Sequence, residues 1–209
     1  MDEIERGWRL FTQDRFSEAE SIFLTVLATA QVDDEQNALA RSGLGYCFAY
    51  TGRFDDARAE FRAVRQHALT DANRFAEHRA LHQIGMVERM AGDWHAALAC
   101  FEEERRMIGE LGDHDLAVAV NAYELGLVAL NLGWVGESRQ HFETSLLAAQ
   151  RTDDLIAVAC AHRGLGDWHA ASDGRQEAKP HWQKALRLFQ DAEDRQGVQG
   201  VVKRLEGTE

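Results

Sequence analysis

A motif of small and aromatic residues recurs five times along the chain. Each copy has a glycine, an alanine or serine 12 residues later, and an aromatic residue four residues after that. The aromatic residues, called anchors below, are Phe23, Phe61, Phe101, Phe142 and Trp182, which are 38, 40, 41 and 40 residues apart. Internal repeats of this length are typical of stacked supersecondary units, each of which buries its apolar face only against its neighbours.

Each copy predicts a helical hairpin. A second glycine, seven residues after the first in copies two to four (Gly52, Gly92 and Gly133), suits the left-handed residue that ends a helix. The first glycine lies inside a helix, where it costs about 1 kcal/mol relative to alanine. We expect it to mark a close contact between the two helices. The chain contains one proline in 209 residues, which favours long helices.

The repeat predicts eleven helices and where each begins and ends. Acidic residues between the copies predict N-caps for the following helices; these are Asp33 or Asp34, Asp71, Asp113, Asp153 or Asp154, and Asp194. The first helices of the hairpins are expected at 2–12, 34–51, 72–91, 114–132 and 154–171. The second helices are expected at 16–30, 55–67, 94–111, 135–151 and 176–191, and a terminal helix at 195–206. The helix predicted around Pro180 must begin late or bend there.

The motif resembles that of the tetratricopeptide repeat family. Its standard repeat has 34 residues. The longer repeat here is similar to those of kinesin light chains, cell-polarity adaptors and the sensor arms of large bacterial signalling ATPases and transcription regulators. The resemblance implies an all-α solenoid, a right-handed superhelix of five helix-turn-helix repeats with a terminal capping helix. It predicts one domain over residues 1–209, with repeats at about 1–32, 33–70, 71–112, 113–152 and 153–193, and a terminal helix at 194–206.

Both ends of the chain leave an alternative open. The first copy lacks about eight residues that open the other first helices, and Gly207 lies where a sixth copy would place its first glycine. The terminal helix is then either a cap, which solenoids need for solubility, or the start of a further repeat in a longer array.

Composition excludes several classes of function. A formal net charge of -12 argues against binding nucleic acid, whose phosphates attract Lys and Arg. Three cysteines do not form a disulfide framework. The sequence has no apolar leader and no run of 18 apolar residues, so we expect a cytoplasmic protein that does not enter a membrane.

No residue pattern predicts catalysis, a metal or a cofactor. His78 and His82 are four residues apart, but the intervening residues do not form the zinc-protease motif, and His162 and His169 are seven apart. No two cysteines have zinc-ligand spacing. The Gly-Leu-Gly sequences at 43–45 and 164–166 do not continue as a phosphate-binding loop. We therefore expect no enzymatic activity.

The resemblance implies that the first helices line a concave groove. Positions three residues before the first glycine of each repeat, and one, four and five after it, would face this groove; some of them could instead face neighbouring helices. Tyr, Met and Arg, which interfaces favour, occur at these positions. The predicted partner-binding groove consists of Tyr46, Tyr50, His82, Met86, Arg89, Tyr123, Leu127 and Asn131.

The groove leads to a functional hypothesis. The family's clamp for a chaperone's C-terminal carboxylate needs Lys and Asn at the inward positions, and Trp8, Tyr46, Met86, Leu127 and Asp167 occupy the place of its Asn. We expect instead a scaffold that binds a peptide or helix of a partner protein. The alternatives are a sensory or regulatory arm of a larger signalling or transcription-regulator protein, and a module that self-associates through its terminal helix.

Overall fold

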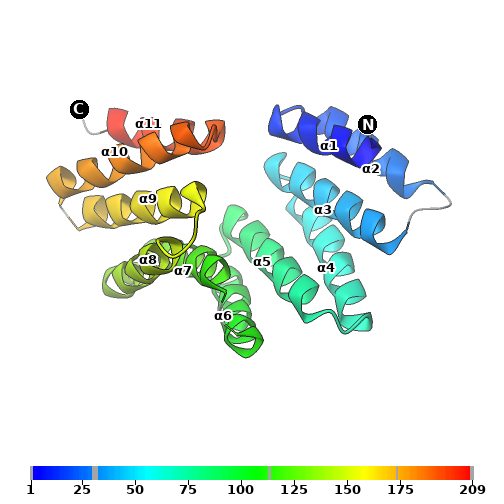
Figure 1. Cartoon of the computed structure of the whole chain (residues 1–209), viewed down its shortest axis with the longest axis horizontal. Helices are drawn as coiled ribbons and strands as arrows, with labels where there is room; N and C mark the ends of the chain where they lie inside the picture. The colour runs from blue at the N-terminus through cyan, green and yellow to red at the C-terminus, as the bar shows by residue number, and fades with distance from the viewer. Residues whose placement is uncertain (1, 30–32, 113, 173, 208–209) are drawn as a thin grey trace. The chain divides into compact units, whose positions relative to one another are not determined.

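The computed structural model describes residues 2–29, 33–112, 114–172 and 174–207. These residues form eleven α-helices and no strand (Figure 1). The helices are α1 (Glu3–Thr12), α2 (Phe16–Leu27), α3 (Asp34–Tyr50), α4 (Phe54–Thr70), α5 (Arg74–Met90), α6 (Trp94–Leu111), α7 (Asp115–Asn131), α8 (Val135–Ala149), α9 (Leu155–Ala171), α10 (Arg175–Asp191) and α11 (Arg195–Glu206).

The predicted helical hairpins are confirmed. Each predicted helix is present, and its ends lie within about three residues of the prediction, as expected for boundaries read from sequence alone. The predicted end of the second helix at residue 30 lies outside the described residues. Five hairpins followed by one helix make this an all-α repeat fold of the solenoid type.

Glycines end three of the first helices as predicted. Gly52, Gly92 and Gly133 have φ angles of 78°, 82° and 80°, in the left-handed region that favours glycine. Asp14 has a φ of 59° at the corresponding position of the first repeat. Each of these residues allows the chain to turn sharply into the second helix of the hairpin.

The N-cap predictions hold at three of the joints between repeats. Side chains of Asp33, Asp154 and Asp194 accept hydrogen bonds from the first turns of α3, α9 and α11. The prediction for Asp71 is wrong, because Asp71 ends α4 and Asn73 caps α5. Ala72, with a φ of 52°, lengthens this turn and moves the cap two residues along the chain. Asp113 lies outside the described residues.

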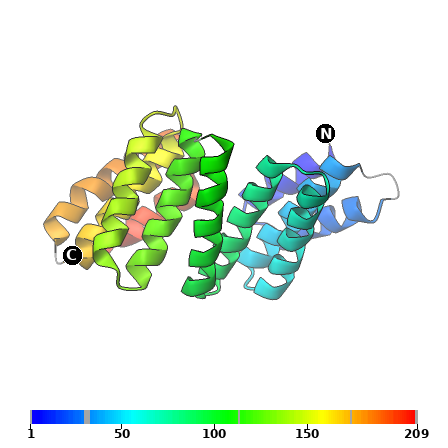
Figure 2. The same ribbon diagram turned by 90° about the horizontal axis from the view of Figure 1, so that it is seen from below.

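The chain divides into two compact units. Unit 1 comprises Met1–Cys100 and unit 2 comprises Phe101–Glu209, so α6 contributes to both. In unit 1 the hairpins α1–α2 and α3–α4 pack through α2 and α3, and α5 packs on α4. In unit 2 the hairpins α7–α8 and α9–α10 pack through α8 and α9, and α11 packs on α10 (Figure 2). The single domain and its repeat limits remain a prediction.

The five anchors are buried as predicted. Phe23, Phe61, Phe101 and Phe142 are 0% exposed and Trp182 is 4% exposed. Four anchor rings lie directly on the first glycine of their own repeat: a Cβ added to Gly7, Gly45, Gly126 or Gly166 would fall within 2.6 Å of a ring atom. The glycine therefore makes room for the aromatic ring, and the alanine or serine of the motif, also 0% exposed, fills the space beside it.

Two anchors also contact the next repeat through a further glycine. The ring of Phe23 lies against Gly43 of α3, and the ring of Phe142 lies against Gly164 of α9, again at distances that leave no space for a methyl group. Each of these rings is held between two glycine-bearing helices of successive repeats.

Pro180 lies inside α10, which begins five residues earlier at Arg175. The side chain of Pro180 is exposed. The helix therefore runs through the proline, and the carbonyl of Gln176 has no amide proton to accept at that turn.

Candidate binding surface of the first helices

Five aromatic side chains gather on α1, α2 and α3 of unit 1. Trp8 and Phe11 of α1 contact Tyr46 of α3, each with ring centroids 5.9 Å apart. Tyr50 contacts Phe11 and stacks on Phe16, both at 5.4 Å. These five residues are called the aromatic cluster below. All are half-buried except Tyr50, which is 39% exposed, so their edges form a surface.

Tyr46 connects this cluster to α5. The ring of Tyr46 packs edge-on against the buried anchor Phe61, with ring centroids 5.3 Å apart, and this contact holds the Tyr46 ring in place. Its hydroxyl oxygen accepts a hydrogen bond of 3.4 Å from Nε2 of Gln83. Gln83 also lines a cavity, so the aromatic cluster and the cavity are neighbours.

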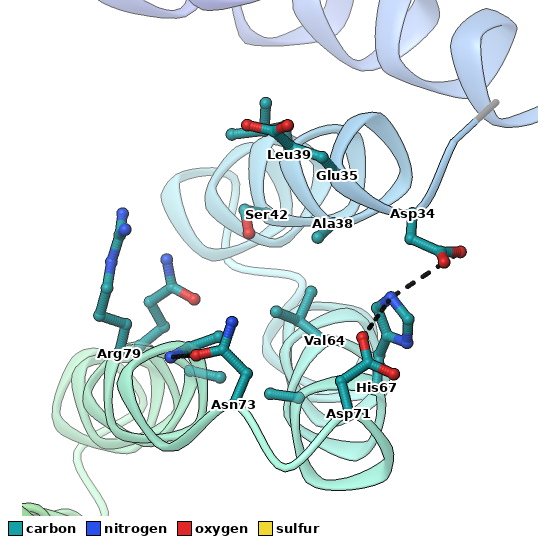
Figure 3. A pocket seen from close by; sticks show the side chains of 14 residues that line it. Asp34, Glu35, Ala38, Leu39, Ser42, Val64, His67, Asp71, Asn73 and Arg79 are labelled. Carbon is teal, nitrogen blue, oxygen red and sulfur yellow. Dashed lines mark hydrogen bonds and ion pairs between the residues drawn. The ribbon is translucent and has the colours of Figure 1, made fainter.

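The cavity lies between α3, α4 and α5 and has a volume of about 440 Å³ (Figure 3). Val64 and Ala68 of α4 form part of its apolar lining, and Ala38 and Ser42 line it from α3. Its size falls in the range of about 300–1,000 Å³ that ligand pockets occupy. It is large enough to receive a side chain of a partner.

Charged residues lie at two places around the cavity. His67 of α4 is between two carboxylates, with Nε2 at 3.8 Å from Asp34 and 3.5 Å from Asp71. Glu35 lines the cavity on the same helix as Asp34, whereas Arg79 lies on α5, away from Asp34 and Asp71 (Figure 3). The side near the start of α3 is therefore acidic.

The other predicted groove residues of unit 1 are on α5. His82, Met86 and Arg89 are half-buried, and none of them lines the cavity. The part of the surface that sequence reasoning missed is the contribution of second helices, namely Phe16 of α2 and His67 of α4. Both lie on the second helix of a hairpin, whereas the positions that the resemblance implies are all on first helices.

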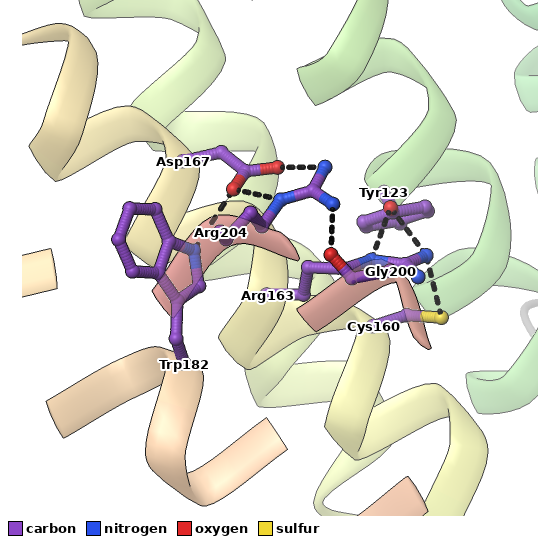
Figure 4. A network of polar contacts seen from close by, with 7 residues as sticks. All are labelled: Tyr123, Cys160, Arg163, Asp167, Trp182, Gly200 and Arg204. Atoms are coloured by element: carbon purple, nitrogen blue, oxygen red, sulfur yellow. Dashed lines mark hydrogen bonds and ion pairs between the residues drawn. The ribbon is translucent and has the colours of Figure 1, made fainter. Parts of the chain in front are cut away.

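In unit 2 the polar groups at three predicted inward positions have partners within the unit (Figure 4). Tyr123 is only 6% exposed, and its hydroxyl oxygen accepts hydrogen bonds of 3.0 and 2.7 Å from Nε and Nη2 of Arg163. Burial raises the pKa of the Tyr123 phenol. Asp167 accepts a hydrogen bond of 2.9 Å from Trp182 and one of 2.8 Å from Arg204 of α11.

This network changes the interpretation of Tyr123 as a groove residue. Its ring packs on Phe142 at 6.0 Å, so it contributes to the core of unit 2 as well as to the inward stripe of α7. Leu127 is half-buried, and Asn131 is exposed and donates to the carbonyl of Leu127 at 2.8 Å. The eight predicted residues are divided between the two units, and their union in one continuous groove remains a prediction.

Three histidines cluster between α9 and α10. The Nδ1 atoms of His162 and His181 are 3.1 Å apart, and the rings of His169 and His181 stack at 5.4 Å. Burial and the neighbouring His181 lower the pKa of His162 to about 4, and burial and His169 lower the pKa of His181. Within the described ranges, no three or more His, Cys, Asp or Glu side chains are grouped as metal ligands.

The histidine cluster predicts that acid destabilises unit 2. In the unfolded chain the imidazoles of His162 and His181 titrate near pH 6.5, so between about pH 6.5 and 4 the unfolded state binds more protons than the folded state. The free energy of unfolding therefore falls as the pH falls through this window. Melting temperatures at neutral pH and at about pH 5 should differ less for His162→Gln than for the wild type. Equal differences in both proteins would contradict this assignment.

None of the helices in the described part of the chain is both long and apolar enough to cross a membrane.

Comparison with known proteins identifies the fold. No family model matches the sequence, and no curated protein matches it. Among solved structures, BtubC from P. vanneervenii is similar with a TM-score of 0.68 and 15% identity, over 94% of this chain and 90% of BtubC. A Podosopora anserina kinesin light chain with TPR-like repeats has a TM-score of 0.66 and 15% identity, over 91% of this chain and 94% of that chain.

A third similar structure is a complex. Bacillus thuringiensis PlcR, solved with the peptide PapR7 and DNA, has a TM-score of 0.78 and 13% identity, over 99% of this chain and 72% of PlcR. At these identities the similarity shows the fold alone. The chain thus has the TPR-like helical-repeat fold that its sequence motif predicts.

Proposed function

We propose that this chain is a protein-interaction module without enzymatic activity, which binds a peptide segment of a partner protein on the first helices of unit 1. The observation that carries the proposal is the continuity between the aromatic cluster and the 440 Å³ cavity, which the contact between Tyr46 and Gln83 joins. Together they offer a surface of aromatic edges beside a cavity, which is a suitable arrangement for an extended segment with one inserted side chain.

The aromatic cluster suits a binding role because its rings are held in place. Tyr46 rests on the buried Phe61, and Phe11 is in contact with both tyrosines of α3. Rigid aromatic side chains lose little conformational entropy when they are covered, and aromatic residues are enriched among the few residues that dominate binding energy. We expect a partner to cover the exposed edge of Tyr50 and the half-buried edges beside it.

The charges around the cavity favour a basic residue in the bound segment. The aliphatic stem of Lys or Arg would pack on Val64 and Ala38, and its charged end would reach Asp34 or Asp71. The formal net charge of -12 would also increase the rate of encounter with a basic partner, an effect that salt screens.

Two alternatives have different tests. The chain matches 72% of PlcR, a protein solved with both a peptide and DNA, and this favours a regulatory arm as the second candidate function. In that case peptide binding would persist and would alter the activity of attached domains. Self-association through α11 would instead appear as a solution mass above that of the 23.5 kDa chain.

Peptides selected from a random dodecapeptide library are expected to bind wild-type protein and to lose about tenfold or more in affinity to two variants. Tyr50→Ala removes the most exposed ring of the cluster, and Ala38→Trp fills the cavity. Titration calorimetry measures the affinities. Phe75→Ala is the matched control, because Phe75 is an aromatic residue of unit 1 that is 50% exposed and lies outside the cluster and the cavity lining.

The proposal fails if the selected peptides bind Tyr50→Ala and Ala38→Trp as tightly as they bind Phe75→Ala. It also fails if the library yields no peptide that binds the wild type. Circular dichroism of each variant shows whether its helices are intact.

A further inference from the structure

A second cavity of about 320 Å³ lies in unit 2 between α6, α7 and α8. Part of its lining is apolar, and Ile108, Leu125 and Ala122 of this part are buried. It is separate from the inward positions considered above, because none of Tyr123, Leu127 or Asn131 lines it. Its polar lining consists of Asn121, Arg105, Gln140, His141 and Thr144.

Asn121 breaks the repeat pattern inside this cavity. It lies five residues before the first glycine of its repeat, where the other long repeats have Ala40, Ala80 and Ala161. All four side chains are buried, and Asn121 is 2% exposed. Burying a primary amide where a methyl group suffices costs free energy unless its donors and acceptors are satisfied.

The hydrogen bonds of Asn121 fix the orientation of its amide. Nδ2 donates to the carbonyl oxygen of Phe101 at 2.9 Å and to the Glu104 carboxylate at 2.8 Å. Because both partners are acceptors, the nitrogen must face them and Oδ1 must face the other way. In the part of the chain that the structure describes, Oδ1 accepts no hydrogen bond.

We propose that this cavity is a binding site for a small aromatic or aliphatic carboxylate that donates a hydrogen bond from its far end to Oδ1 of Asn121. The body of the ligand packs on Ile108, Leu125 and Ala122, and its carboxylate lies at Arg105 and His141. The volume of the cavity is at the small end of the range for ligand pockets, and this limits the size of the ligand.

The residues near the carboxylate position suit this ligand. Arg105 bonds Glu102 at 2.6 Å and retains further N–H donors in its guanidinium group. Burial and the positive charge of Arg105 lower the pKa of His141, so its neutral imidazole offers one N–H at pH 7. The cavity lining thus offers donors for a ligand carboxylate at Arg105 and His141, and an acceptor for a ligand hydroxyl or N–H at Asn121.

The test compares 4-hydroxyphenylacetate with phenylacetate, which differ only in the hydroxyl donor. Wild-type protein should bind the hydroxylated compound about five- to tenfold more tightly, the effect of one hydrogen bond. In Asn121→Ala this preference should disappear. Titrations followed by NMR give the affinities, and the side-chain amide signal of Asn121 should shift on binding. Gln150→Ala, which removes an exposed amide of the same unit outside the cavity, should keep the preference.

Three results would overturn the inference. They are failure of both compounds to bind wild-type protein, equal affinity of the wild type for both, and a preference that persists in Asn121→Ala. The wild-type comparison needs no variant, so it decides the matter even if Asn121→Ala does not fold. Binding by Asn121 is independent of the peptide surface of unit 1, so either proposal can fail alone.

Discussion

Phe142→Ala is expected to lower the free energy of unfolding of unit 2 by about 3–5 kcal/mol. The ring of Phe142 is 0% exposed and is held between Gly126 of α7 and Gly164 of α9. Neither glycine has a side chain that could move into the space left behind, so the substitution loses the buried surface of the ring and leaves a cavity. Phe101→Ala should also cost about 3–5 kcal/mol, because Phe101, the anchor of the third repeat, is 0% exposed and its removal loses the same buried surface.

Urea unfolding followed by circular dichroism measures this loss, with Trp134→Ala as the matched control. Trp134 is an aromatic residue of the same unit that is 41% exposed, so its removal should change stability far less. If Phe142→Ala and Trp134→Ala are equally stable, the anchor is not the packing element that its position indicates.

Gly164→Ala is expected to destabilise unit 2 by about 1–3 kcal/mol, although alanine is the better helix former. A Cβ at this position would lie 2.4 Å from two ring atoms of Phe142, well inside van der Waals contact. The ring has no free side to move to, because Gly126 of α7 holds it from the other direction. The added methyl group therefore forces α8 and α9 apart.

Gly109→Ala is the control and should have the opposite sign. Gly109 is an exposed residue within α6, and a Cβ there would meet no atom within 4 Å. Alanine should stabilise this helix by up to about 1 kcal/mol. Urea unfolding of the two variants gives both values. Stabilisation by Gly164→Ala would refute the close contact, and relief of its cost in the background of Phe142→Leu would support it.

The sequence predicted the fold well because one steric relationship repeats. A glycine and an aromatic residue 16 positions apart come into contact when the two helices that carry them pack closely. The pair recurs at Gly45 and Phe61 and at Gly126 and Phe142, and this recurrence sets the register of the hairpins. The turn after α4 could not be placed so well. Ala72 adopts a left-handed φ without any glycine to indicate it, which moved the cap from Asp71 to Asn73.

The candidate site was less predictable, because a residue's place on a helix does not say what it contacts. Tyr46 and Tyr123 are at related inward positions, yet the hydroxyl of Tyr123 is bound by Arg163. Arg163 lies 40 residues later at the same position of the next repeat, so comparing equivalent positions of successive repeats would have indicated this pair. The cavity near Tyr46 also needs Val64 and His67 of α4, and no feature of the motif distinguishes them.

Two anchor rings are each shared between successive repeats, and this sharing determines which repeats depend on one another for packing. Phe23 is enclosed only when the glycines of both the first and second repeats are in place, and Phe142 needs both the fourth and the fifth. At the joints after the second and third repeats, Gln83 and Glu124 occupy the position of that second glycine. We therefore expect the first and second repeats, and the fourth and fifth, to be coupled through a shared anchor ring. A recombination event that removed the fifth repeat alone would uncover the side of the Phe142 ring that lies on Gly164, and one that removed the first repeat would take away the Phe23 ring that covers Gly43.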